Sequence, residues 1–222
     1  MGGTLGCMKS CVLVSLLMIL FPFVAAQNTP RLETPPIHFR WSERQAHELD
    51  DDHTIRNSTA LTPPEKKSIT DAIIQTLKRE DDEDMTATER IRLASETRVE
   101  FVDLDGDGLP EVIAQADGLG PCGGTGNCVF WIFKLTPSGT KVLLDSTLTG
   151  GTRFELVTVR PWTTNGYRDI VLASHSSATA RNITWFRFAD GKYRPSACYY
   201  LSWIGDAGRP IKSPDISSES CN

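Results

Sequence analysis

Residues 99–114 read VEFVDLDGDGLPEVIA, and this stretch decides the fold class of the chain. Its two ends, 99–102 and 111–114, are short runs of β-branched and apolar residues, and they are separated by aspartate and glycine. Short runs divided by turn residues are typical of β-strands joined by a tight connection. The same pattern continues outward and predicts six further strands, near 129–133, 141–144, 154–159, 169–173, 183–188 and 199–201.

The connection between the first two strands gathers acidic side chains. Loop positions one, three, five and nine are carboxylates, and the glycine at position six permits the sharp turn that an oxygen-lined calcium site requires. Carboxylates drawn to one point repel one another unless a cation lies among them, so we expect the order of this loop to depend on an ion. Calcium is favoured over magnesium because a flexible cage of oxygens suits the larger ion. The alternative is an acidic turn without metal, for which aspartates at alternate positions are a poor choice.

The loop departs from a complete EF-hand. Position twelve is Ala114 instead of a bidentate glutamate, and both flanks are expected to be strands. The pattern instead resembles the calcium loop of FG-GAP and VCBS-like repeats, which occur in integrin-type propellers and in many exported bacterial proteins. The resemblance rests on FVDLDGDG at 101–108 and EVI at 111–113, and it covers residues 99–200 at most. It implies that one calcium ion is bound by the side chains of Asp103, Asp105, Asp107 and Glu111 and by the backbone carbonyl of Leu109.

The strands fall into two similar series. EVI at 111–113 and DIV at 169–171 are each followed by an aromatic strand with a tryptophan, Trp131 or Trp185, and then by a glycine-containing turn. An internal repeat of about four strands is typical of a propeller-blade unit, and two units are too few to close a ring. The second series keeps only Asp169 as a carboxylate in its loop, so we expect one ion and not two.

Two helices are expected before the strands. TPPE at 62–65 supplies an N-cap, a proline at the first helical position and a glutamate three residues after the cap. Apolar residues then recur at helical spacing, and a shorter helix is expected at 86–95. The predicted fold class is α+β, mostly β, with N-terminal helices packed on two propeller-blade-like antiparallel β repeats. The expected divisions are a signal peptide (1–26), a flexible leader (27–61), a helical segment (62–96), two repeats (97–148 and 152–203) and a C-terminal tail (204–222).

The first 26 residues have the features of a secretory signal. Lys9 precedes an apolar run of about 14 residues, which is too short to cross a bilayer, and small residues follow at Ala25 and Ala26. A short uncleaved anchor is the alternative. We therefore expect a secreted or periplasmic protein with no membrane span after signal removal.

Four cysteines follow the signal, and an oxidising compartment favours pairing them. Three pairings are possible. Cys122 and Cys128 flank a glycine-rich turn, and a bond between Cys198 and Cys221 would restrain the polar tail, so we expect these two disulfides. A zinc site built from the four thiols is the alternative, but no CxxC spacing supports it.

Charge and motifs limit the functions that the chain can have. Removing Lys9 with the signal leaves 22 basic and 28 acidic side chains, and the basic ones are scattered among acids, which argues against nucleic acid as a partner. The sequence contains no HExxH, P-loop or G-x-S-x-G motif, and the one histidine with hydroxyl residues on both sides is His175. We therefore expect no catalytic residues and a non-catalytic module that presents its surface to an unknown protein or glycan ligand. The alternatives are a secreted enzyme or enzyme inhibitor with an unrecognised groove, and a purely structural envelope protein.

Overall fold

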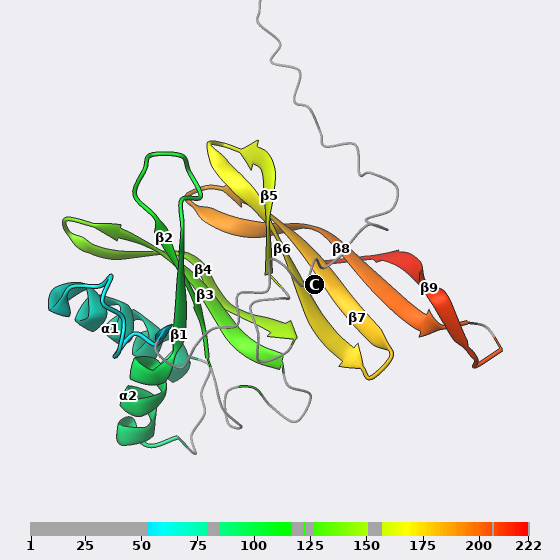
Figure 1. The fold of residues 1–222 in the computed structure, drawn as a ribbon, viewed down its shortest axis with the longest axis horizontal. Coiled ribbons are helices and arrows are strands. Elements are labelled where there is room, and N and C mark those ends of the chain that lie inside the picture. Colours follow the sequence, from blue (N-terminus) through cyan, green and yellow to red (C-terminus); the bar gives the residue numbers. More distant parts are fainter. Residues whose placement is uncertain are drawn as a thin grey trace, which may run out of the picture. The chain divides into compact units, whose positions relative to one another are not determined.

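The computed structural model describes residues 53–79, 85–116, 122, 127–150, 157–205 and 207–221, with the backbone alone at 146–150. The predicted signal peptide and most of the predicted leader lie outside the described residues. Two helices precede nine strands in the described part (Figure 1). The elements are α1 (Pro63–Arg79), α2 (Ala87–Glu96), β1 (Arg98–Val102), β2 (Glu111–Gln115), β3 (Asn127–Thr136), β4 (Gly139–Gly150), β5 (Val157–Thr164), β6 (Tyr167–Ser177), β7 (Ala180–Ala189), β8 (Lys192–Ile204) and β9 (Pro210–Glu219).

Both helices begin within one residue of the expected starts, and capping residues hold each start. The backbone N–H and the hydroxyl of Thr62 donate to one carboxylate oxygen of Glu65, each at 2.7 Å. At the start of α2, Thr86 and Glu89 form a reciprocal capping box. These bonds satisfy backbone N–H groups that the first turn of a helix leaves without partners.

The strands form two antiparallel sheets, and each sheet follows chain order. Sheet 1 has the order β1-β2-β3-β4 and sheet 2 has the order β5-β6-β7-β8-β9 (Figure 1). Every segment that the sequence analysis expected to be a strand overlaps one of the first eight strands. The mostly β character and the two helices are therefore confirmed.

The structure corrects two of the expected divisions of the chain, the leader and the C-terminal tail. The leader was expected to run to residue 61, but Thr54 bridges to Arg98 of β1, and Ile55 is buried in the core. The tail was expected from residue 204, but β9 pairs with β8 along most of its length. Its polar composition and its two prolines hide the strand in the sequence, since an edge strand needs apolar residues on one face only and tolerates proline.

Three hydrophobic clusters organise the described residues. The first combines residues of α1 and α2 with residues of sheet 1, among them Ile69, Ile73 and Trp131. The second is shared by the two sheets and includes Leu104 of the acidic loop and Phe186 of β7. The third draws its members from sheet 2 alone. The second cluster therefore brings the acidic loop against sheet 2.

An asparagine side chain also connects the two sheets. The Nδ2 atom of Asn127, at the start of β3, donates to the carbonyl of His175 at 2.8 Å, and its Oδ1 atom accepts from the backbone N–H of His175 at 2.8 Å. The amide thus occupies the place that a neighbouring strand's backbone would take beside β6.

We expect Asn127→Ala to lower the free energy of unfolding by about 1–2 kcal/mol, because it leaves both backbone groups of His175 without this partner. Urea unfolding monitored by tryptophan fluorescence would measure the change. Asn57→Ala, at an exposed position, is the control. Equal stability of the two variants would contradict the connecting role of Asn127.

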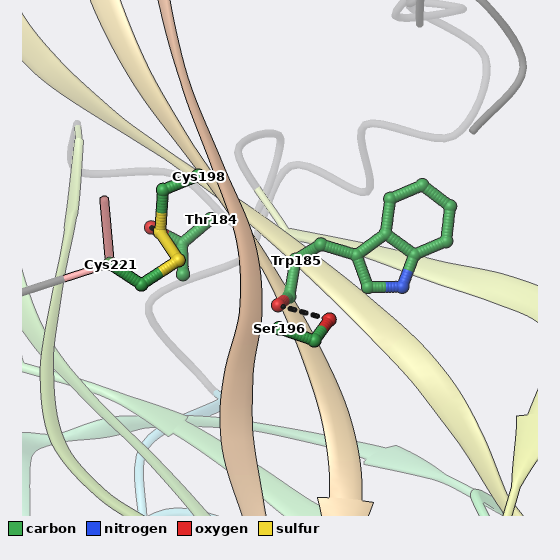
Figure 2. Close-up of a disulfide and its surroundings, with 5 residues drawn as sticks. All are labelled: Thr184, Trp185, Ser196, Cys198 and Cys221. Atoms are coloured by element: carbon green, nitrogen blue, oxygen red, sulfur yellow. Dashed lines mark hydrogen bonds between the residues drawn. A yellow bond between two sulfur atoms is a disulfide. The ribbon is translucent and has the colours of Figure 1, made fainter. Parts of the chain in front are cut away.

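The structure contains two disulfide bonds, Cys122–Cys128 and Cys198–Cys221, which are the two pairs expected from the sequence. They indicate an oxidising compartment. Figure 2 shows the second bond beside Thr184, with the indole of Trp185 directed away from it. The bond connects β8 to the chain that follows β9, so it holds the end of the β8–β9 pairing that is opposite the connecting turn.

Candidate cation site in the acidic loop

The acidic loop closes the hairpin between β1 and β2, where Val102 pairs with Glu111. Its turns depend on two glycines with positive φ, Gly106 at 75° and Gly108 at 84°. Both glycine N–H groups donate to the carboxylate of Asp103, at 2.7 Å and 3.2 Å. The first aspartate thereby holds the backbone of the loop in a tight curl, as the glycine spacing predicts.

Glu111 lies at the base of the loop and has no exposed surface. Its Oε2 atom accepts a hydrogen bond from the backbone N–H of Leu104 at 2.8 Å. Leu104 is itself fully buried between the sheets, and its carbonyl accepts from the N–H of Arg168 at 2.7 Å. The buried glutamate is therefore held by a loop that is in turn bound to β6.

Three of the predicted ligands come together. Carboxylate oxygens of Asp103, Asp105 and Glu111 all lie within 4.8 Å of one another. Asp107 lies outside this group, and its Oδ1 atom accepts from the backbone N–H of Leu109 at 2.8 Å. The side chain of Leu109 is exposed, and the expected ligation by its carbonyl stays a prediction.

Lys134 places an ammonium group among these carboxylates. Its Nζ atom forms a hydrogen bond and ion pair with Asp105, lies 2.7 Å from Asp107 Oδ2 and lies 3.2 Å from Glu111 Oε1. The contact with Glu111 is an ion pair without hydrogen-bond geometry, so Oε1 has no hydrogen-bond partner among the described residues. The loop thus already encloses a cation, and that cation belongs to the chain.

The carboxylates and the ammonium shift one another's pKa values. Desolvation alone would lower the pKa of Lys134, but its contacts with Asp105, Asp107 and Glu111 outweigh it and raise that pKa. Burial raises the pKa of Glu111, and its hydrogen bond from the Leu104 N–H and its ion pair with Lys134 only partly oppose the rise. The pKa of Asp107 is lowered, first by its hydrogen bond from Lys134 and then by that from Leu109. At neutral pH Lys134 is therefore a permanent positive charge.

Tyr167 forms the side of the site contributed by sheet 2. The Lys134 ammonium lies 5.8 Å from the centre of its ring, and the ring stacks on Phe188 at 3.8 Å between centroids. Burial, followed by a hydrogen bond with Asp105, raises the pKa of Tyr167 to about 12. The phenol therefore stays neutral beside the carboxylates.

The sequence analysis missed both Lys134 and Tyr167. Lys134 follows the apolar run at 129–133, and because Val112 pairs with Phe133, it lies opposite Glu111. That register is visible only once the strands are paired. Tyr167 follows the turn at Asn165 and Gly166, which have positive φ of 50° and 86°.

In the corresponding loop of the second strand series, the carboxylate of Asp169 forms hydrogen bonds within sheet 2. Asp169 is buried, and its two oxygens accept hydrogen bonds from Thr164 Oγ1 at 2.7 Å and from Trp185 Nε1 at 2.9 Å. Its carboxylate thus joins side chains of β5 and β7 to β6. In the described part of the chain it belongs to no group of clustered ligand atoms.

Compared with known proteins, the chain matches no family model, no curated protein and no solved structure. None of the helices that the structure describes is long and apolar enough to cross a membrane.

Proposed function

We propose that the chain is an exported, non-catalytic interaction module of FG-GAP or VCBS-like type, in which the acidic loop binds one calcium ion. Asp103, Asp105 and Glu111 would hold the ion by their side chains, with Asp107 and the Leu109 carbonyl completing the set. Bound calcium would supply the positive charge that keeps the loop closed. The two sheets would act as blade-like units that present a rigid surface to a ligand.

The observation that supports the calcium site best is the fully buried Glu111, which has a carboxylate oxygen within 4.8 Å of carboxylate oxygens of Asp103 and Asp105. Carboxylates gathered this closely repel one another, so the group favours a cation among them. One ammonium carries a single positive charge for the four carboxyl groups of the loop, and oxygen ligands of this kind suit calcium. Lys134 contacts the same oxygens, so calcium would have to displace its ammonium.

Export is supported by the disulfides together with the signal-like first 26 residues. Paired cysteines are rare in reducing compartments. The interaction role is supported by the sheet architecture, since the described residues form two sheets that share a buried core.

We expect calcium to raise the melting temperature of the protein by several degrees relative to chelator, because an ion that binds only the folded state stabilises it. Differential scanning calorimetry would measure the shift, and isothermal titration would give the stoichiometry, expected to be one ion. The double variant Asp105→Asn/Asp107→Asn should lose both responses. Asp215→Asn, an exposed change on β9, is the control and should keep both. Identical melting of the unmodified protein with calcium and with chelator, and no heat of binding, would refute the calcium site.

A further inference from the structure

Sheet 2 has a second face, on the side opposite the core that it shares with sheet 1. Along β7, Phe186 and Phe188 enter the shared core, so Arg187 between them points the other way. Trp185 and Tyr199 belong to the cluster that sheet 2 forms alone. We call Arg160, Trp162, Trp185, Arg187 and Tyr199 the basic aromatic face.

Aromatic rings and a guanidinium are stacked on this face. The rings of Trp162 and Trp185 lie 5.7 Å apart between centroids at an interplanar angle of 27°. The guanidinium carbon of Arg160 lies 4.5 Å from the Trp162 ring and 5.4 Å from the Trp185 ring. Trp162 remains 36% exposed, which is unusual for so large an apolar side chain. Stacking therefore holds Arg160 in place while leaving one indole open to solvent.

Three buried polar atoms on the face have no hydrogen-bond partner among the described residues. They are the Nε atoms of Arg160 and Arg187 and the hydroxyl of Tyr199. Arg187 Nε lies 3.6 Å from the nearest oxygen of Asp169, and both oxygens of that carboxylate already accept other hydrogen bonds. Buried donors seldom lack an acceptor, so the two arginines lie beside the indoles with hydrogen-bonding capacity that the described residues do not use.

The charge of the face identifies the kind of acceptor. Arg181 follows the same alternation along β7, and Arg194 pairs with Arg187 across to β8, so both are directed to this side. Among the described residues of β5 to β9, Asp169 is the one acidic residue whose side chain lies on this face. The whole chain has a net charge of −5, so a positive face on it selects anions.

We propose that the basic aromatic face binds an acidic polysaccharide, with a sugar ring on Trp162 and its carboxylate paired with Arg160 and Arg187. This inference rests on the proposed interaction function and names its ligand. A pyranose ring offers a flat C–H face that packs on an exposed indole, and a carboxylate accepts two parallel hydrogen bonds from a guanidinium. An acidic peptide would supply the carboxylate but no flat ring for Trp162. Glycan recognition therefore explains both the stacked indoles and the donors without partners.

The test is isothermal titration of the full chain with a galacturonic acid hexamer, in calcium. We expect binding that weakens with salt, and we expect Trp162→Ala and Arg160→Ala each to weaken it at least about tenfold. Ile91→Ala and Arg92→Ala on α2 are the matched controls, since Ile91 is an exposed apolar side chain and Arg92 an exposed arginine. Trp162 is exposed, so its variant should fold normally, which circular dichroism would verify.

Each other outcome has a definite meaning. No binding at about 1 mM hexamer, or equal binding by the Trp162 variant, would overturn the inference. Equal affinity for a glutamate hexapeptide, with the same dependence on Trp162, would replace it with an acidic-peptide site. Calcium binding without glycan binding would refute this inference alone, whereas glycan binding without any calcium response would refute the metal part of the proposed function. Cleavage of the hexamer would refute its non-catalytic part.

Discussion

Replacing Lys134 with methionine is expected to lower the free energy of unfolding by about 2–3 kcal/mol in chelator and to raise calcium affinity at least about tenfold. Without the ammonium, Glu111 is a buried carboxylate close to Asp105 with no compensating charge, and removing one partner from such a cluster is costly. The value is set below that of a fully buried pair because the Lys134 side chain is partly exposed. Calcium would bind more tightly because it would no longer have to displace an ammonium from the same oxygens.

Both effects are measurable on the same samples. Urea unfolding in chelator gives the loss of stability, and isothermal titration gives the calcium affinity. Lys141→Met is the matched control, because Lys141 is an exposed lysine that pairs with Lys134 across β3 and β4. A Lys134 variant that is destabilised but binds calcium no more tightly than the unmodified protein would show that the ammonium and the ion do not compete. A variant with unchanged stability would show that Lys134 does not neutralise the loop.

The double variant Cys198→Ser/Cys221→Ser is expected to lose about 3 kcal/mol of stability. The bond closes a segment with a sequence separation of 23 residues, which contains the β8–β9 turn and all of β9, so reduction lets the unfolded chain gain much conformational freedom. The folded state also depends on it, since β9 is an edge strand whose pairing with β8 is one-sided.

Urea unfolding and hydrogen exchange would separate these contributions. We expect fast exchange of the amides of β9 in the double variant, while those of β6 and β7 keep their protection, because only the edge strand loses its covalent restraint. Ser218→Ala, an exposed change in β9, is the control. Unchanged midpoints and unchanged β9 protection would show that hydrogen bonds alone hold this edge.

Much of the secondary structure was predictable because its causes are local. The capping residues in TPPE place the start of α1, and short β-branched and apolar runs place the first eight strands. β9 escaped detection because a strand at the edge of a sheet is defined by its partner more than by its own composition. The same limit applies to Ile55 and Leu61, which are buried only because α1 and sheet 1 surround them.

The candidate site likewise has a part that depends on local sequence and a part that depends on tertiary contacts. The acidic residues, their spacing and the turn glycines occupy nine consecutive positions, so the sequence alone predicts a cation-binding loop. The mostly β fold is likewise predictable from the sequence. The presence of Lys134 and Tyr167 beside that loop depends on pairing and packing between residues that are distant in the sequence, and so does the gathering of Arg160, Trp185 and Tyr199 on one face. Such contacts follow from strand register and from burial summed over two sheets, which no short stretch of residues encodes.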